Sequence, residues 1–306
     1  MFKTFGFGAK LLTLILLSLI SVVAALFVVG TGGLLYAQLN GMTTAQLSDD
    51  GTYLRVFQIL TSLIMFVIPA TAYSKLFDNN LKEGLYLDKR PPALLTLLAI
   101  ITMVSALPLS NLLSIINSHL ALPDCMSGIE TWMRNKEDSS QALVAKIILT
   151  DSFAVYLFNI VTLALIPAIS EELFFRATVQ KLISGSMRQQ ILAAIITAVI
   201  FSAIHMQFYG FLPRFMLGFL LGFMLICTKS IYVPIMAHFV NNFIAITYAH
   251  VTGEFMEEPQ NQELSTLITI SLLSAVVVAI LLVVQWKISH SKKYATKSQD
   301  NLQLNK

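Results

Sequence analysis

Long apolar stretches recur along the 306-residue chain and limit the folds open to it. A stretch of about 20 apolar residues is long enough to cross a bilayer as a helix. Charged residues make up 12% of the chain, about half the share found in soluble domains. We therefore expect an all-α polytopic membrane helix bundle with about eight transmembrane helices. The predicted spans are Leu11–Ala37, Tyr53–Tyr73, Ala93–Ile116, Ser152–Arg176, Gln190–Gln207, Phe211–Cys227, Ile231–His250 and Leu264–Trp286.

The connecting segments alternate in charge. Acidic or mixed segments lie at 49–50, 124–138 and 254–263, and basic residues gather in the alternate connections. By the positive-inside rule, this pattern predicts that both termini are cytoplasmic. The net charge of +3 is too small to indicate a nucleic-acid partner. The basic residues are Lys3, Lys10, Lys75, Lys82, Lys89, Arg90, Arg176, Lys181, Arg188, Lys229, Lys287, Lys292, Lys293 and Lys297.

The segment Ser170–Arg176 places two carboxylates and a guanidinium inside an apolar stretch. Ionisable groups within a membrane are costly and usually functional. Glu172 and Arg176 are four residues apart with the acid first, which favours an ion pair on a helix. Glu171 lies about 100° further round the helix and has no counter-charge among the next three residues, so it is suited to act as a general base. The alternative is that both acids only hold neighbouring helices together.

Three further polar residues lie in later apolar stretches, at similar depth. Glu171 and His205 lie roughly 20 and 24 Å from the turn at 184–189, if each residue adds about 1.5 Å along a helix. His238 and Asn242 share one helix face and lie roughly 12 and 18 Å from the preceding loop. We expect the four side chains to meet in one cavity below the cytoplasmic surface.

These side chains favour hydrolysis by an activated water, because no Ser or Cys nucleophile motif accompanies them. Glu171 would remove the proton of the water, and His205 would orient the water or share that proton. His238 and Asn242 would donate hydrogen bonds to the oxyanion. A zinc site formed by Glu171, His205 and His238 is the alternative, although no His-Glu-x-x-His motif is present.

Three motifs resemble those of the CPBP (ABI) family of intramembrane peptidases, which includes CAAX-prenyl-protease-like and bacteriocin-processing members. They are Glu-Glu-x-x-x-Arg at 171–176, Phe-x-x-x-His at 201–205 and His-x-x-x-Asn at 238–242, in a core from Phe153 to His250. The resemblance implies that Glu171 is the catalytic glutamate and that Glu172 and Arg176 are a supporting pair. It implies a water-activating role for His205 and an oxyanion site at His238 and Asn242. Asn241 is adjacent, but the i, i+4 spacing favours Asn242. Both metal-dependent and metal-independent mechanisms are held for the family.

The apolar stretches, together with the resemblance over the core, suggest how the chain is divided. We expect residues 1–117 to form three N-terminal transmembrane helices and residues 152–288 to form the catalytic core. Residues 289–306 would be a polar cytoplasmic tail. Between them, 118–151 would be an external loop containing an interfacial amphipathic helix or, alternatively, a packed surface loop.

The predicted function is an intramembrane endopeptidase of the cell membrane, cleaving a peptide or membrane-protein substrate near the cytoplasmic side of the bilayer. Its preferred mechanism needs no cofactor, and zinc is the alternative cofactor. Two other functions remain open: a non-catalytic membrane partner or immunity protein, and an ion-coupled transporter that relays protons through Glu171 and the histidines. The transporter is disfavoured because no internal repeat is apparent.

Overall fold

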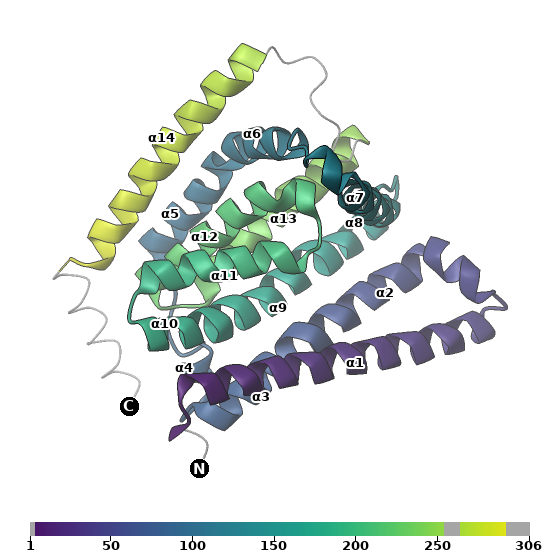
Figure 1. Cartoon of the computed structure of the whole chain (residues 1–306), viewed down its shortest axis with the longest axis horizontal. Helices are drawn as coiled ribbons and strands as arrows, with labels where there is room; N and C mark the ends of the chain where they lie inside the picture. Colours follow the sequence, from purple (N-terminus) through teal and green to yellow (C-terminus); the bar gives the residue numbers. More distant parts are fainter. Residues whose placement is uncertain (1–3, 254–263, 292–306) are drawn as a thin grey trace.

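The computed structural model describes residues 4–253 and 264–291, and within these ranges all regular structure is helical (Figure 1). The α-helices are α1 Phe7–Leu39, α2 Gly51–Ser62, α3 Ile68–Phe77, α4 Leu81–Gly84, α5 Ala93–Ser105, α6 Leu107–Ser118, α7 Ser127–Ile148, α8 Phe153–Asn159, α9 Ile166–Phe174, α10 Lys181–Met187, α11 Gln190–Ile204, α12 Phe211–Thr228, α13 Tyr232–Thr252 and α14 Leu264–Ser289. Short 3₁₀ helices are η2 Thr44–Asp49, η4 Asp124–Met126 and η7 Phe208–Gly210. Three π-helical turns are η3 Leu63–Val67, η5 Ile160–Leu165 and η6 Phe175–Gln180.

The π-helical turns join shorter helices into two long ones, 51–77 and 153–187. In each long helix a proline follows a π turn: Pro69 is the second residue of α3, and Pro167 is the second residue of α9. Proline has no backbone N–H and crowds the carbonyl four residues earlier, so the regular α-helical ladder cannot pass through it. A π turn is one way in which a helix continues past such a break.

Five helical segments in the described part of the chain are long and apolar enough to cross a membrane. They are 7–39, 51–77, 153–187, 208–228 and 264–289. The number of spans is six if α5 and α6 are taken together; the two helices are bent by 41° at their junction, and Pro108 is the second residue of α6. The chain is a multi-pass membrane protein, but the predicted count of eight is not confirmed. Helix α11 has only 15 residues, and polar residues lower the hydropathy of the 21-residue α13.

The bundle has a core flanked by two outer groups (Figure 1). Helix α1 packs along α2 and α3 on one side, and α14 packs against α5 and α6 on the other. Helices α9, α11, α12 and α13 lie between them, and α11 and α12 form a closely packed pair. This arrangement encloses the charged segment of α9 between the outer groups.

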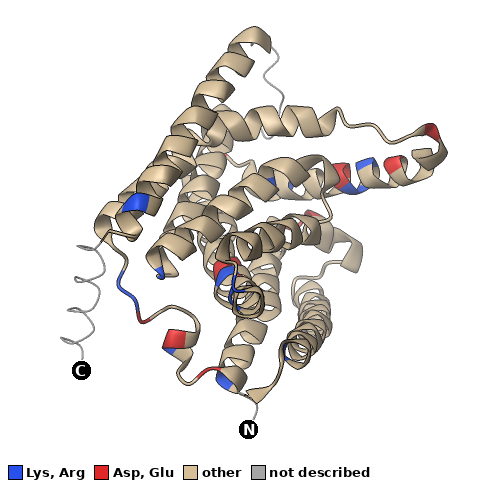
Figure 2. Ribbon diagram, turned by 60° about the vertical axis from the view of Figure 1, so that its left-hand side comes forward, with Lys and Arg blue, Asp and Glu red and all other residues tan. Residues whose placement is uncertain are grey.

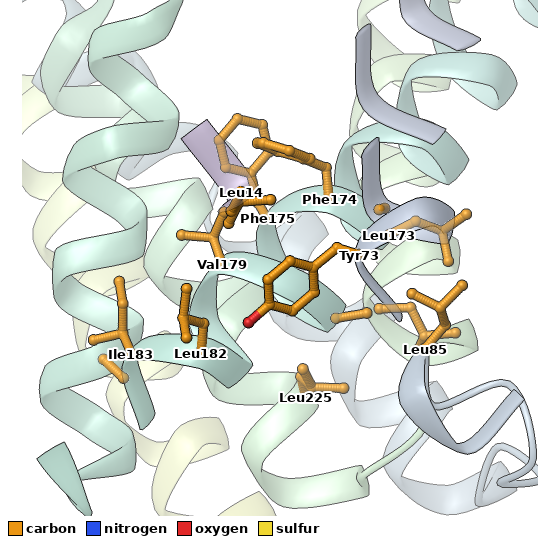
Figure 3. Packing of buried hydrophobic residues seen from close by; sticks show 14 of the residues in the cluster. Leu14, Tyr73, Leu85, Leu173, Phe174, Phe175, Val179, Leu182, Ile183 and Leu225 are labelled. Atoms are coloured by element: carbon orange, nitrogen blue, oxygen red, sulfur yellow. The ribbon is translucent and has the colours of Figure 1, made fainter. Parts of the chain in front are cut away.

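A buried apolar cluster fills the space where the N-terminal helices meet the core (Figure 3). Phe174 and Phe175, at the junction of α9 and η6, pack edge to face with ring centroids 5.1 Å apart. Phe66 of η3 contacts both rings. The residues that surround the ionisable segment on this side are thus aromatic and aliphatic, so water is kept from it.

Most of the ribbon is free of charged residues, which recur along α7 and in the connections and also occur on a central helix (Figure 2). Helix α7 forms over most of the predicted external segment, and its exposed side chains include Ile129 and Trp132. The polar tail predicted for 289–306 lies mostly outside the described residues.

Candidate active site

A buried ion pair joins the first motif to the helix that carries the third. Arg176 donates to Glu172 Oε1 at 2.8 Å, and both side chains have 0% exposure. The same oxygen lies 2.9 Å from His238 Nδ1 on α13. Arg176 also donates to the Gly218 carbonyl of α12 at 3.0 Å. Glu172 and Arg176 together therefore link α9, η6, α12 and α13.

Two glycines four residues apart let α12 approach this network. The carbonyl of Gly218 accepts from Arg176, and the carbonyl of Gly222 accepts from Gln180 at 3.0 Å. A Cβ at Gly218 would lie 3.1 Å from the Phe201 ring, and one at Gly222 would lie 2.7 Å from Oε1 of Gln180. Small residues at this spacing are typical of close helix contacts in membranes.

The candidate catalytic side chains line a single cavity of about 300 Å³. Glu171, His205, His238 and Asn242 come from three different segments of the chain, and all four are in its wall. The structure thus brings together the residues singled out by the three motifs. The other lining residues are Gln58, Met103, Leu163, Pro167, Phe201, Arg214, Leu217, Leu221 and Asn241.

His205 is held at the C-terminal end of α11. Its Nδ1 lies 2.7 Å from the Phe201 carbonyl, which can only accept, so Nδ1 carries the proton. In the neutral ring, Nε2 then has a free lone pair. A nitrogen in this state can accept a proton from a water molecule in the cavity.

His238 is oriented by Glu172. Because Glu172 Oε1 accepts from Arg176 as well, Nδ1 of His238 is the donor in its contact with this oxygen. Neutral His238 would offer only a lone pair at Nε2. The ring can donate from Nε2 only when both of its nitrogens carry a proton.

Both Asn241 and Asn242 line the cavity. Asn241 Nδ2 donates to Asn242 Oδ1 at 3.2 Å, and Asn242 Nδ2 donates to the Leu163 carbonyl at 3.3 Å. Pro167 follows four residues after Leu163 and has no N–H for that carbonyl. The proline therefore leaves an acceptor that orients Asn242, and the second N–H of the amide remains for a ligand.

Sequence reasoning missed Arg214 and Gln58, which also line the cavity. Arg214 donates from Nη1 to the Gln207 carbonyl at 3.0 Å and also bonds the Gln207 side chain. The sequence does mark Arg214, because it is the one charged residue in the apolar stretch 211–227. Like Glu171, Arg214 is an ionisable residue within an apolar stretch, where such residues are usually functional.

The side chains do not form a metal-binding cluster. Among the described residues, no group of three or more His, Cys, Asp or Glu side chains is placed to share an ion. The side chains of the alternative zinc set, Glu171, His205 and His238, line the same cavity without forming such a group. The Nδ1 contact of His238 with Glu172 is also found around catalytic metals, but here Arg176 shares the same oxygen.

Comparison with known families agrees with the motifs. Residues 153–244 match the family described as type II CAAX prenyl endopeptidase Rce1-like, and this range contains all four candidate catalytic residues. No curated protein and no solved structure matches the chain. The resemblance drawn from the three motifs is thereby confirmed, because residues 153–244 are similar to the CAAX-protease family.

Proposed function

We propose that this protein is an intramembrane endopeptidase that hydrolyses a peptide bond near the cytoplasmic side of the cell membrane. The observation that carries the proposal is the meeting of Glu171, His205, His238 and Asn242 around one cavity inside the family-matched range. The family is one of peptidases, which supports a peptide as substrate and a membrane as surroundings.

In the proposed mechanism, Glu171 removes a proton from a water molecule in the cavity. Glu171 is suited to this role because Glu172, not Glu171, accepts the Arg176 hydrogen bond. His205 accepts a hydrogen bond from the same water at Nε2, since its Nδ1 proton is committed to the Phe201 carbonyl. General-base assistance of this kind contributes roughly 10²–10⁴ in rate.

The oxyanion of the tetrahedral intermediate is stabilised by His238 and Asn242. His238 serves as a donor when protonated on both nitrogens, with Nδ1 held by Glu172. Asn242 supplies the N–H that is not used by the Leu163 carbonyl. The buried pair of Glu172 and Arg176 acts through His238 and does not touch the substrate.

The test is cleavage of a prenylated CAAX peptide by purified protein in lipid vesicles. Glu171→Gln keeps the shape of the side chain and removes its basicity, so cleavage should fall by at least about 10². Glu83→Gln, which neutralises an exposed carboxylate on α4, should cleave like the wild type. Equal cleavage by wild type and Glu171→Gln would overturn the assignment of the base.

Metal dependence is tested on the same preparation. The proposed mechanism keeps its activity after chelation, because Glu171 activates the water directly. If zinc were required, the purified protein would contain about one ion per chain and chelation would stop turnover. Such a stoichiometric, activity-linked ion would contradict the metal-free mechanism.

The proposed orientation places both termini in the cytoplasm and crosses the membrane eight times, with α11 and α13 as the two additional spans. The native cysteines provide a test, because Cys125 is exposed and Cys227 is buried. A membrane-impermeant maleimide should label Cys125 in intact cells, and Cys125→Ser should abolish that labelling. Labelling of Cys125 only after lysis would overturn the orientation.

A further inference from the structure

The loop that follows His205 is held in place by residues from several helices. Residues 206–212 follow His205, which comes directly after α11, and they include η7 and the first two residues of α12, the helix that carries Arg214. We call residues 206–212 the clamp loop. Its first residue, Met206, has a φ of 52°, the left-handed region that favours glycine. A methionine keeps this conformation only where the surrounding contacts enforce it.

Two buried polar side chains from outside the cavity provide such contacts. Asn117 of α6 donates to the Phe208 carbonyl at 2.9 Å and accepts from the Leu212 N–H at 2.7 Å. Glu137 of α7 accepts from the Tyr209 N–H at 3.2 Å. Each has 4% exposure, and none of these three bonds belongs to a regular helix.

Further contacts fix the clamp loop from α7 and α12. Trp132 packs on Phe208 with ring centroids 5.5 Å apart, and the Arg134 guanidinium lies 4.4 Å from the Tyr209 ring centroid. The Arg214 guanidinium reaches back to Gln207. The Arg214 guanidinium fits here because residue 210 is a glycine. A Cβ at this position would lie 2.7 Å from Arg214 Nη2.

Charge also links α7 to the cavity. The carboxylates of Glu137 and Glu171 both act electrostatically on Arg214, so Glu137 balances part of a positive charge in the cavity wall. A buried carboxylate is costly unless it is hydrogen-bonded or paired with an opposite charge. Helix α7 thus contributes one hydrogen-bond acceptor and one charge to the side of the site where His205 ends α11.

We propose that Glu137 is a positioning residue for His205, acting through the clamp loop, and that α7 and Asn117 hold this loop for catalysis. In its kinetic part the inference rests on the proposed function. Its physical basis is that a shift of about 1 Å in a catalytic group can cost up to about 10² in rate. Loosening the clamp loop should therefore lower kcat and leave peptide binding nearly unchanged.

The experiment compares Glu137→Ala, Glu137→Gln and Asn117→Ala with Asp138→Asn, a change at an exposed neighbour on α7. The assay is cleavage of the prenylated CAAX peptide in vesicles, accompanied by hydrogen exchange of the amides of residues 206–212. We expect Glu137→Ala and Asn117→Ala to lower kcat about tenfold or more, with KM within about twofold and faster exchange in the clamp loop. Glu137→Gln should restore part of kcat, because its amide oxygen still accepts the Tyr209 N–H. Asp138→Asn should match the wild type.

Wild-type kcat in both Glu137→Ala and Asn117→Ala would overturn the inference. So would activity losses that merely follow a lowered melting temperature, with no recovery in Glu137→Gln. A wild-type protein that cleaves no peptide would instead overturn the proposed function. In that case, unchanged exchange in the Glu137→Ala clamp loop would count against the inference independently.

Discussion

The chain contains two Glu–Arg pairs with the same i, i+4 spacing and the same order. Glu172 and Arg176 lie 2.8 Å apart with no exposed side-chain surface. Glu130 and Arg134 on α7 lie 2.7 Å apart, but 19% and 46% of their side-chain surfaces are exposed. Distance and spacing do not separate the two pairs. Their surroundings do.

The difference shows that the effect of such a pair depends on what else each partner bonds. The charges of an exposed pair are screened by water, so the pair contributes little. A buried pair is costly to desolvate and persists where further hydrogen bonds complete it. His238 and the Gly218 carbonyl provide such bonds for the inner pair, so the inner pair connects residues of the candidate site, while the outer pair bonds the Leu122 N–H and contacts the Tyr209 ring at the surface.

The largest expected effect comes from breaking the inner pair. Glu172→Ala or Arg176→Ala should destabilise the fold by about 3–5 kcal/mol, because each leaves an uncompensated buried charge. Removing both should cost less than the sum of the two single changes. Unfolding of the three variants in detergent measures this, and strict additivity would show that the two residues do not act as a pair.

A second variant separates catalysis from folding within the inner site. Asn242→Ala removes a proposed oxyanion donor and should lower kcat by about 10²–10³, with a melting temperature close to that of the wild type. Asn241→Ala is the matched control, since Asn241 lines the same cavity and should cost less. A larger loss from Asn241→Ala would exchange the roles of the two amides.

A third variant tests whether the inner network needs the close approach of α12. Gly222→Ala would place a Cβ 2.7 Å from Oε1 of Gln180 and should destabilise the protein by about 1–3 kcal/mol through overpacking. The control is Gly128→Ala on α7, where no atom lies within 4 Å of the added Cβ. Equal melting temperatures for the two variants would show that α12 can move away without loss.

The smallest effect is expected at the outer pair. The hydrogen bond from Arg134, followed by that from the Leu122 N–H, lowers the pKa of Glu130 below its usual value. A carboxyl whose pKa is lower in the folded state stabilises the fold above its unfolded pKa, and the effect disappears as pH falls through the folded value. Glu130→Gln should therefore lower the melting temperature slightly at neutral pH and leave it unchanged in acid. A large loss at neutral pH would remove the contrast between the pairs.

The spacing of residues along one helix predicted the contacts within that helix. It could not predict the contacts between helices. The approach of Glu172 to Arg176 follows from helix geometry alone, so it could be read from the sequence. The contact between Glu172 and His238 spans 66 residues and depends on how helices pack, which no local pattern reports. Arg214 was overlooked although its position in an apolar stretch marked it. The clamp-loop contacts of Asn117 and Glu137 link segments more than 70 residues apart, and neither residue stands out in its own stretch.

The number of membrane-spanning helices could also be predicted only in part from the sequence. Hydropathy delimited the apolar stretches, but α11 is only 15 residues long and the Ala93–Ile116 stretch bends at its middle. Both depart from a simple count of 20-residue segments. Helix α13 also differs from a simple apolar span, because the polar residues that it contributes to the cavity lower its hydropathy.

The orientation of the site residues on α9 depends on the number of residues in the π-helical turns that flank it. Each residue of an α-helix turns the chain by about 100°, so deleting one residue from η6 would rotate Glu171 and Glu172 away from the partners that the rest of the chain presents. Segments η5 and η6 flank α9 on both sides, so the insertion or deletion of a single codon anywhere in 160–180 would be more damaging than many substitutions there. Aligned relatives that keep the site should have no gaps in this interval.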